Sequence, residues 1–174
     1  ENGMQADPEQ FKSILAQWST GVTVATTVAP YGTWHGITAT SFASVSLEPP
    51  LVLVCVGRTL AFREAVERSG VFAINILSRE QGHWGLVFAG LVPDVTDRFA
   101  GIACTTAQTG SPILPDTSGW LDCRVWNTYD GGDHLIFVGE VLTGEAAPDR
   151  PPLLYYNRRW GGFTVGAADD VPAR

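Results

Sequence analysis

The sequence predicts a mainly β protein, an antiparallel barrel with a few flanking helices, and three observations lead to this prediction. Stretches rich in β-branched and other apolar residues outnumber stretches with helical spacing. The strand-like stretches follow one another through turn signals, which favours an antiparallel barrel over a sheet of alternating βαβ units. No Gly-x-Gly-x-x-Gly motif opens a helix after a strand, so a dinucleotide fold of that type is not indicated.

Length and composition indicate a single globular domain. The chain has 174 residues, of which 45% are hydrophobic and 17% charged, and a chain of this size can bury a substantial core. We expect one domain over residues 8–165, with flexible termini at residues 1–7 and 166–174. The net charge of -7 opposes binding to nucleic acid or to anionic membrane surfaces.

The longest apolar run, residues 51–56, is too short to span a bilayer. We therefore expect a soluble, cytoplasmic protein with neither a nucleic-acid nor a membrane partner. The three cysteines, Cys55, Cys104 and Cys123, are odd in number and far apart, which predicts buried reduced thiols. No Cys or His pair has the spacing of a metal site.

The first helix is predicted from its capping residues. Asp7 can cap it, Pro8 stands at its first position and Gln10 at its third. The helix is expected to end near residues 20–21. Apolar residues follow at helical spacing, and they are Phe11, Ile14, Leu15 and Trp18.

The following stretches alternate between strand and turn signals. Strands are expected over residues 22–27, 36–47 and 51–56, with a turn at residues 30–32. Thr59 can cap a short helix that contains a Glu64–Arg68 pair and ends at Gly70. Residues 71–77 then return to strand.

A second capping box, Ser78 with Gln81, opens a helix that ends at Gly90. Prolines interrupt residues 91–119, where one strand is expected over residues 102–107. The last clear pair of strands, residues 120–128 and 135–142, forms a hairpin around the turn-rich residues 129–133.

Hydroxyl and small side chains alternate along residues 36–52, and this is the most informative segment. From composition alone it is a half-exposed strand with Thr and Ser facing solvent. Its pattern, Gly-x-Thr-Ala-x-Ser-Phe followed by Ser-x-Ser-Leu-x-Pro-Pro, resembles the flavin-binding strand of the flavin reductase-like domain family. The resemblance implies an FMN-binding split β-barrel, with a Greek-key-like antiparallel arrangement, and five ordered blocks extend it over residues 11–163.

The first two blocks resemble the parts of the family that hold the flavin. In relatives the isoalloxazine ring lies against the strand that corresponds to residues 38–41, and the loop after residues 54–56 reaches the flavin phosphate. Arg58 suits a phosphate, and the alternative is that it is an ordinary surface charge. Many relatives have serines where Leu60 and Ala61 stand, so this sequence departs from the family pattern at these two positions.

The third block, residues 88–90 and 97–99, resembles a family segment that approaches the flavin. A cation there would favour the anionic reduced flavin, and Arg98 is the candidate. The alternative is that Arg98 pairs with Asp97 or Asp94 and orders the loop.

The fourth block, Gly132-Asp133-His134, resembles a family motif that lies on the nicotinamide side of the flavin. His134 is the candidate catalytic residue, although a lone histidine is more often structural. His35 and His83 lack such a context and are interpreted as structural.

The fifth block, residues 152–163, resembles a closing segment that lies near the flavin pocket across a dimer interface. Tyr156 and Arg159 could contact an adenine ring and a pyrophosphate, or the segment could be an interface anchor without a ligand. The resemblance as a whole implies these cofactor-binding positions: Thr38, Ala39, Thr40, Ser41, Cys55, Val56, Arg58, Thr59, Phe88, Arg98, Tyr156 and Arg159.

The activity that the resemblance implies is that of a homodimeric NAD(P)H-dependent flavin reductase. It would transfer hydride from NADH or NADPH to FMN or FAD and supply reduced flavin, by diffusion, to a partner monooxygenase. Two alternatives remain open, an oxidoreductase that retains FMN and acts directly on an organic substrate, and a non-enzymatic flavin-binding module.

Overall fold

The computed structural model describes residues 6–163, which form an antiparallel β structure with short helices. The helices are α1 (Pro8–Leu15), α2 (Ala61–Ser69) and α3 (Gly82–Phe88), and the 3-10 turns are η1 (Pro30–Gly32) and η2 (Arg79–Gln81). The strands are β1 (Thr20–Gly21), β2 (Thr23–Val28), β3 (Trp34–Ala39), β4 (Ala43–Leu47), β5 (Pro50–Gly57), β6 (Val71–Ile76), β7 (Thr105–Thr106), β8 (Pro112–Ile113), β9 (Gly119–Gly131), β10 (His134–Ala146), β11 (Leu153–Tyr156) and β12 (Arg159–Gly162). The mainly β, antiparallel prediction is confirmed.

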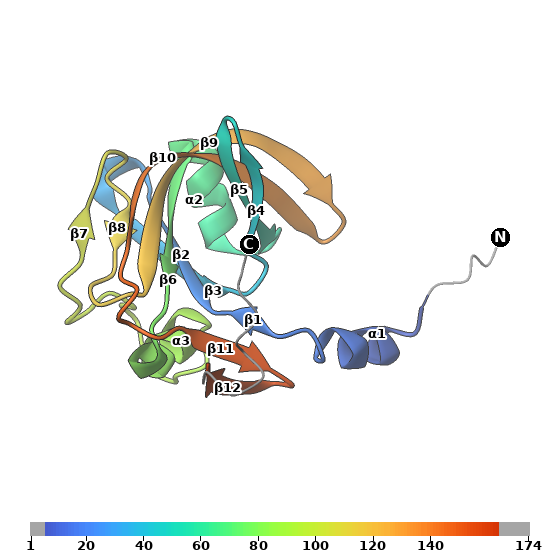
Figure 1. The fold of residues 1–174 in the computed structure, drawn as a ribbon. Helices are drawn as coiled ribbons and strands as arrows, with labels where there is room; N and C mark the ends of the chain where they lie inside the picture. Colours follow the sequence, from blue (N-terminus) through green and yellow to red (C-terminus); the bar gives the residue numbers. More distant parts are fainter. Residues whose placement is uncertain (1–5, 164–174) are drawn as a thin grey trace.

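Seven of these strands form one curved sheet in the order β3-β2-β6-β9-β10-β5-β4, with antiparallel pairing throughout. A smaller sheet, β1-β11-β12, lies beside α3 (Figure 1). Helix α2 packs inside the curve and contacts β2, β3 and β5 (Figure 1). Its buried residues, Phe62, Ala65 and Val66, thereby join both halves of the sheet to one core.

The core follows from the alternation of side chains along the strands. Val52, Val54 and Val56 of β5 are buried, whereas the residues between them are half-exposed. Phe72 and Phe137 fill the centre of the same cluster. The predicted strand 51–56 is therefore correct in position, but only one of its faces is fully buried.

The two ends of the seven-stranded sheet are joined by a very short connection. Strands β3 and β4 are its opposite edges, yet only residues 40–42 separate them along the chain. A link this short requires the sheet to curl until its edges approach each other. The predicted continuous strand over residues 36–47 is thus wrong at its middle, where the chain leaves one edge and enters the other.

Helix α1 differs from the prediction in length and in environment. It ends at Leu15, although Asp7 caps it as expected by accepting a hydrogen bond from the Gln10 N–H (3.0 Å). None of its residues is buried, and it extends away from the sheet (Figure 1). Its apolar side chains therefore have no core to pack against within the described chain.

Three further local predictions are wrong and one is confirmed. Helix α2 begins at Ala61 with no side-chain cap from Thr59, and the ion pair on it joins Arg63 to Glu67 rather than Glu64 to Arg68. The strand expected over residues 102–107 is reduced to Thr105–Thr106. The capping box of Ser78 and Gln81 is present and opens η2.

The β9–β10 hairpin is longer than predicted, because pairing continues to Gly131 and His134 and leaves a two-residue turn. The three cysteines are free, and burial raises the pKa of Cys104 to about 11 and that of Cys123 to about 12. No helix within residues 6–163 is long and apolar enough to cross a membrane. Of the termini predicted to be flexible, residues 1–5 and 166–174 lie outside the described residues, as do residues 164–165 of the predicted domain.

Candidate flavin and nicotinamide site

The connection between the two sheet edges is fixed by Ser41. Its hydroxyl donates to the carbonyl oxygen of Cys55 (3.0 Å) and accepts from the N–H of the same residue (3.1 Å). Both backbone groups of Cys55 are therefore occupied by one side chain from the connection. This places Ser41 and Cys55, two predicted cofactor-binding residues, side by side.

Thr38 and Ala39 precede the connection, and both are turned toward the protein. The Thr38 hydroxyl donates to the carbonyl oxygen of Gly85 in α3 (2.7 Å). Ala39 is buried, and its carbonyl oxygen accepts from the hydroxyl of Thr23 (2.7 Å). Thr40, in contrast, is exposed. The segment thus presents backbone and small side chains at the surface. On its protein side, hydrogen bonds from the hydroxyl groups of Thr38 and Thr23 fix its position.

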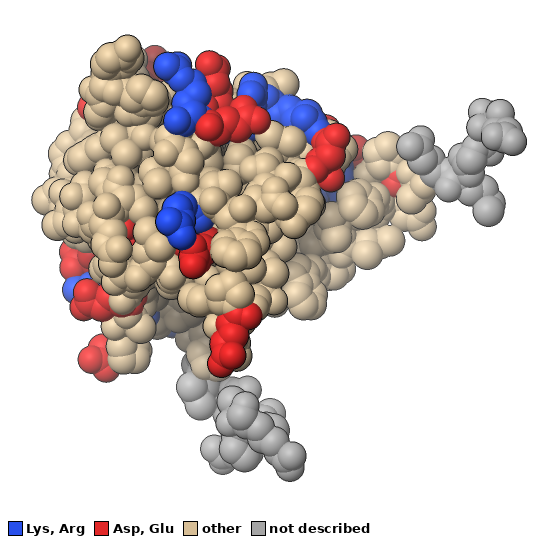
Figure 2. All heavy atoms as spheres, turned by 90° about the horizontal axis from the view of Figure 1, so that it is seen from above, with Lys and Arg blue, Asp and Glu red and all other residues tan. Residues whose placement is uncertain are grey.

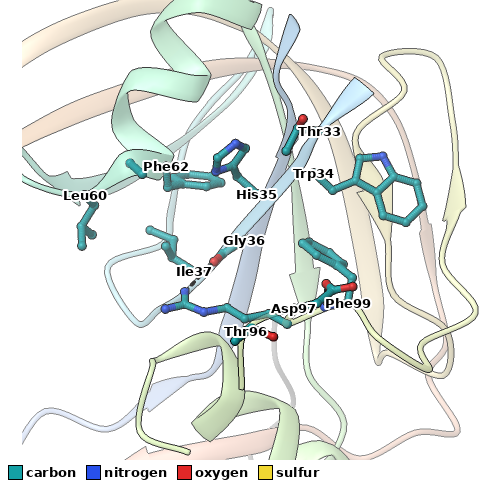
Figure 3. A pocket seen from close by; sticks show the side chains of 12 residues that line it. Thr33, Trp34, His35, Gly36, Ile37, Leu60, Phe62, Thr96, Asp97 and Phe99 are labelled. Carbon is teal, nitrogen blue, oxygen red and sulfur yellow. Dashed lines mark hydrogen bonds between the residues drawn. The ribbon is translucent and has the colours of Figure 1, made fainter. Parts of the chain in front are cut away.

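A cavity of about 440 Å³, here called the β3-edge cavity, opens beside the first half of this strand (Figure 3). Three segments line it: residues 33–37 on β3, residues 60–62 at the start of α2, and residues 96–99 of the loop after α3. In Figure 3, Leu60 and Phe62 lie on one side of β3, and Trp34 and Phe99 lie on the other.

Arg98 holds the loop after α3 against β3. Its Nη1 donates to the carbonyl oxygens of Gly36 (3.0 Å) and Phe88 (3.1 Å). The first of these bonds is the dashed line at Gly36 in Figure 3. Among the described residues no carboxylate pairs with Arg98, so the alternative of a pair with Asp97 or Asp94 is not what the structure contains. Its guanidinium retains N–H groups that can face a bound anion.

Aromatic rings line and support the same cavity. Phe99 meets Phe88 at a centroid distance of 5.0 Å and Trp34 at 5.6 Å, both in edge-to-face geometry. Phe88 is only 1% exposed, so its role is to support the loop from within the core. Gly36 is required at this place, because a Cβ there would lie 2.6 Å from the Phe88 ring.

A second cavity of about 620 Å³, here called the α1 cavity, lies at the other end of the connection. Thr40 and Ser41 line it together with Trp18, Tyr155 and Arg158. The hairpin β11–β12 and α1 are joined there, since the Asn157 N–H donates to the Ala16 carbonyl (2.8 Å) and the Tyr156 hydroxyl to Gln17 (3.2 Å).

Of the two residues predicted on that hairpin, neither lines the α1 cavity. Tyr156 is half-exposed and bonded to Gln17, and Arg159 is exposed. Arg158, between them, reaches the cavity instead. Sequence reasoning missed Arg158, Trp18 and Trp34. The two adjacent arginines were visible, but only the positive φ of Asn157 and Arg158 in the turn decides which one faces the cavity.

Arg58 is engaged with the β9–β10 turn. Its Nε donates to the carbonyl oxygen of Gly132 (2.7 Å), its Nη2 pairs with the carboxylate of Asp130, and its backbone N–H donates to the carbonyl oxygen of Asp133 (3.0 Å). The residue therefore joins the loop after β5 to the turn that precedes His134. Thr59, next to it, is exposed.

His134 begins β10 opposite Gly57 of β5. Its Nδ1 lies 2.6 Å from a carboxylate oxygen of Asp133, and this hydrogen bond, followed by the charge of the imidazolium form, lowers the pKa of Asp133. The Nε2 atom faces Gly57, where a Cβ would lie 3.9 Å away. An imidazole oriented in this way keeps one nitrogen free for a ligand.

One other predicted residue, Val56, is placed differently from the rest. Val56 is 1% exposed and points into the core, so only its backbone could meet a cofactor. Residues 38–41 and Cys55 lie together at the β3–β4 connection, and Arg58 and His134 meet at the β9–β10 turn. Phe88 and Arg98 lie beside Gly36, and Tyr156 and Arg159 lie apart on the β11–β12 hairpin. Within residues 6–163 no group of three or more His, Cys, Asp or Glu side chains could hold a metal ion.

The chain is similar to known proteins over most of its length. Residues 15–164 match the family described as "Flavin reductase like domain". The reductase subunit HsaB of a flavin-dependent monooxygenase from Rhodococcus jostii is 40% identical over 168 residues, which cover 97% of this chain and 84% of that protein.

Solved structures extend the comparison. A homologue of nitrilotriacetate monooxygenase component B from Mycobacterium thermoresistibile superimposes with a TM-score of 0.85 at 38% identity, over 95% of this chain and 90% of the other. An NADH:FAD oxidoreductase of Streptomyces globisporus, in complex with NAD and FAD fragments, gives a TM-score of 0.84 at 33% identity, over 95% and 99% of the chains. By sequence and by fold, the chain belongs to the flavin reductase-like domain family.

Proposed function

We propose that the β3–β4 connection holds a flavin whose ring lies along residues 38–41, and that a nicotinamide nucleotide enters from the α1 cavity. The chain is an NAD(P)H-dependent flavin reductase of the kind that serves two-component monooxygenases. The observation that carries the site is the short connection between the two sheet edges. Thr40 and Ser41 of this connection line the α1 cavity, and the β3-edge cavity lies beside the strand that leads into it.

The residues around the connection fit a flavin. Small side chains leave the strand surface open to a flat ring, and Arg98 offers N–H groups toward the β3-edge cavity. The hydroxyls of Thr38 and Ser41 are used to fix the backbone, so donors for the ring edge come from the main chain and from Thr40. A preorganised set of donors costs no reorganisation when the ligand arrives.

When bound, the flavin accepts hydride from the nicotinamide, and this chemistry belongs to the two cofactors. The protein has to bring the two rings together and exclude water. Trp18 and Tyr155 provide apolar walls on the α1 side, and Arg158 provides a cation for a nucleotide phosphate. Because the two cofactors carry out the hydride transfer, the site requires no Ser-His-Asp triad and no carboxylate pair.

His134 is proposed to contact the nicotinamide through Nε2. The bond from Asp133 to Nδ1 would hold the ring in one orientation, and Arg58 would hold the turn that carries both residues. Arg58 is therefore better suited to positioning His134 than to binding a phosphate, unless a phosphate displaces Asp130 from it.

The functional unit is proposed to be a homodimer. The apolar side chains of α1, and Trp18 just after it, are largely exposed in the described chain: Phe11 is 54%, Ile14 62%, Leu15 53% and Trp18 74% exposed. A broad part of the face in Figure 2 also carries almost no charged groups, as expected of a surface that another chain covers. A second copy would cover α1 and close the α1 cavity. We place this dimer in the cytoplasm, with a flavin-dependent monooxygenase receiving reduced flavin by diffusion.

Anaerobic titration of the purified chain with NADH or NADPH, in the presence of FMN or FAD, tests the activity. Flavin absorbance should bleach in proportion to the nucleotide added.

Steady-state oxidation of NADH with and without free flavin tests the delivery of reduced flavin, because a reductase that releases its product needs free flavin in every cycle. Turnover that is independent of added flavin would instead support an enzyme that retains FMN, and binding without turnover a non-enzymatic module.

A further inference from the structure

The turn between β9 and β10 carries His134 at the end of a hairpin that the rest of the sheet supports only in part. The pairing of β6 with β9 ends at Arg124, whereas β9 continues to pair with β10 to the end of the hairpin (Figure 1). Among the described strands, residues 126–131 of β9 therefore pair with β10 alone. The turn itself consists of Gly132 and Asp133, and both are exposed. A hairpin end of this kind keeps one position only when contacts from another element hold it.

Arg58, in the loop after β5, supplies such contacts. Its Nε donates to the carbonyl oxygen of Gly132 (2.7 Å), and its backbone N–H donates to that of Asp133 (3.0 Å). Its Nη2 forms an ion pair with the carboxylate of Asp130, the last residue but one of β9. The loop after β5 therefore holds both the strand and the turn that lead to His134.

Arg58 is itself tied to the core through α2. The Nε of Arg63 in α2 donates to the carbonyl oxygen of Arg58 (3.1 Å), and the Arg63 guanidinium pairs with Glu67 on the next turn of the helix (2.5 Å). Phe62 and Val66 anchor this helix in the main hydrophobic cluster. A continuous series of bonds thus runs from a helix that is packed in the core to the end of the hairpin.

His134 lies on the same face of the sheet as the Cys55 side chain. It stands opposite Gly57 on β5, and Gly57 follows Cys55 by two residues. Residues two apart on a strand share a face and are separated by about 7 Å. Because the backbone of Cys55 is bonded to Ser41 of the β3–β4 connection, a movement of the hairpin end would change the distance from His134 to a ring bound at this connection.

We propose that Asp130 and Arg58 form a positioning pair for hydride transfer: together they hold the β9–β10 turn so that His134 reaches the nicotinamide. This inference rests on the proposed function, which places the nicotinamide at His134 and assigns no role to Asp130. Neither member of the pair lines the β3-edge cavity or the α1 cavity. The pair therefore acts on the reaction only through His134.

The pair is too exposed to contribute much to global stability. The side chains of Arg58 and Asp130 are 40% and 83% exposed, and an ion pair in such an environment adds little to the free energy of unfolding. It does restrict the guanidinium, which without Asp130 would be held to the hairpin end by its single bond to the Gly132 carbonyl. We therefore expect Asp130→Asn to loosen the hairpin end in a protein that remains folded.

Single-turnover reduction of flavin by NADH in stopped flow, compared with equilibrium binding of flavin alone, tests the inference. Asp130→Asn should slow the reduction about 5- to 50-fold, since a group misplaced by 1 Å can cost about a hundredfold in rate. The dissociation constant for flavin should change less than about twofold, and Tm by less than about 4 °C.

Double variants show whether the pair acts through His134. Arg58→Ala should slow the reduction as much as Asp130→Asn does, and the two changes combined should not slow it further, because the two residues act as a unit. In a His134→Ala protein, Asp130→Asn should leave the rate of reduction unchanged, since the group that the pair positions is then absent.

Glu140→Gln is the matched control. It breaks the ion pair of Arg124 with Glu140 (2.6 Å), which crosses the same hairpin away from the turn, and it should change neither the rate nor the flavin affinity. Weaker flavin binding in Arg58→Ala with tighter binding in Asp130→Asn would assign Arg58 to the flavin phosphate and overturn the positioning role. An unchanged rate in Asp130→Asn, or the same loss in the His134→Ala background or in Glu140→Gln, would also overturn it. Failure of the unmodified chain to bind or reduce flavin would instead overturn the proposed function.

Discussion

Replacing Gly36 by Ala should destabilise the protein and weaken flavin binding together. A Cβ at this position would lie 2.6 and 2.7 Å from two atoms of the Phe88 ring and 3.1 Å from Phe99. Phe88 is 1% exposed, so the ring cannot yield into solvent, and β3 has to move by about 1 Å to reach an ordinary contact. Overpacking of a core in this way costs about 1–3 kcal/mol. In a chain of this length that loss lowers Tm by about 2–12 °C.

The same displacement would move the Gly36 carbonyl away from Arg98, which bonds to it at 3.0 Å, and flavin affinity should fall as a result. Thermal unfolding followed by circular dichroism and flavin titration by fluorescence measure the two effects. Gly21→Ala is the matched control, because Gly21 is also a strand glycine and a Cβ there would meet nothing within 4 Å. A Gly36→Ala protein with the Tm and flavin affinity of the Gly21→Ala protein would refute the reasoning.

Three further predictions concern charge and chemistry. Arg98→Ala should weaken flavin binding about tenfold to a hundredfold, since two carbonyl oxygens lose a charged donor and the cavity loses its cation, and an unchanged flavin titration and reduction potential would remove the assignment. His134→Ala should raise the KM for NADH or slow flavin reduction in stopped flow, whereas His83→Ala should do neither, and equal kinetics in the two variants would make His134 structural. Burial first, and the Asp122 carboxylate second, raise the pKa of Cys123 to about 12. The folded protein therefore keeps the thiol protonated while the unfolded chain ionises it near pH 8.5, so this contribution to stability is complete below that pH and is lost as pH rises. Urea midpoints should fall between pH 8.5 and 10.5, and a fall of the same size in Cys123→Ala would contradict this cause.

The strand proposed to bind the flavin could be singled out from the sequence because its pattern is local. Gly36, Thr38 and Ser41 stand in a sequence motif that resembles the family, and the structure places them on or beside β3. Their detailed roles were not predictable. The hydroxyls of Thr38 and Ser41 bond to Gly85 and Cys55, which are 47 and 14 residues away in the chain, and such partners depend on how strands and helices pack.

Helix α1 and Arg58 also show that local sequence patterns do not predict tertiary contacts. The helical spacing of Phe11, Ile14 and Leu15 predicted a helix, but it did not show that these side chains would be exposed in the described chain. Arg58 was predicted to bind phosphate from its residue type, but its guanidinium meets Asp130 and Gly132 across the β9–β10 hairpin. Residue type indicates what a side chain can bind, and tertiary neighbours determine what it does bind.

By itself, the sequence determined the mainly β class, the capping box at Ser78, the β9–β10 hairpin and the family, because strand alternation, caps and turns depend on neighbouring residues. Only the tertiary structure decided that β3 and β4 are the two edges of one curled sheet. That decision requires strand pairings between distant residues, such as β2 with β6 and β10 with β5. Strand pairing depends on long-range register, which no local pattern fixes, and it is this pairing that creates the connection and the two cavities near it.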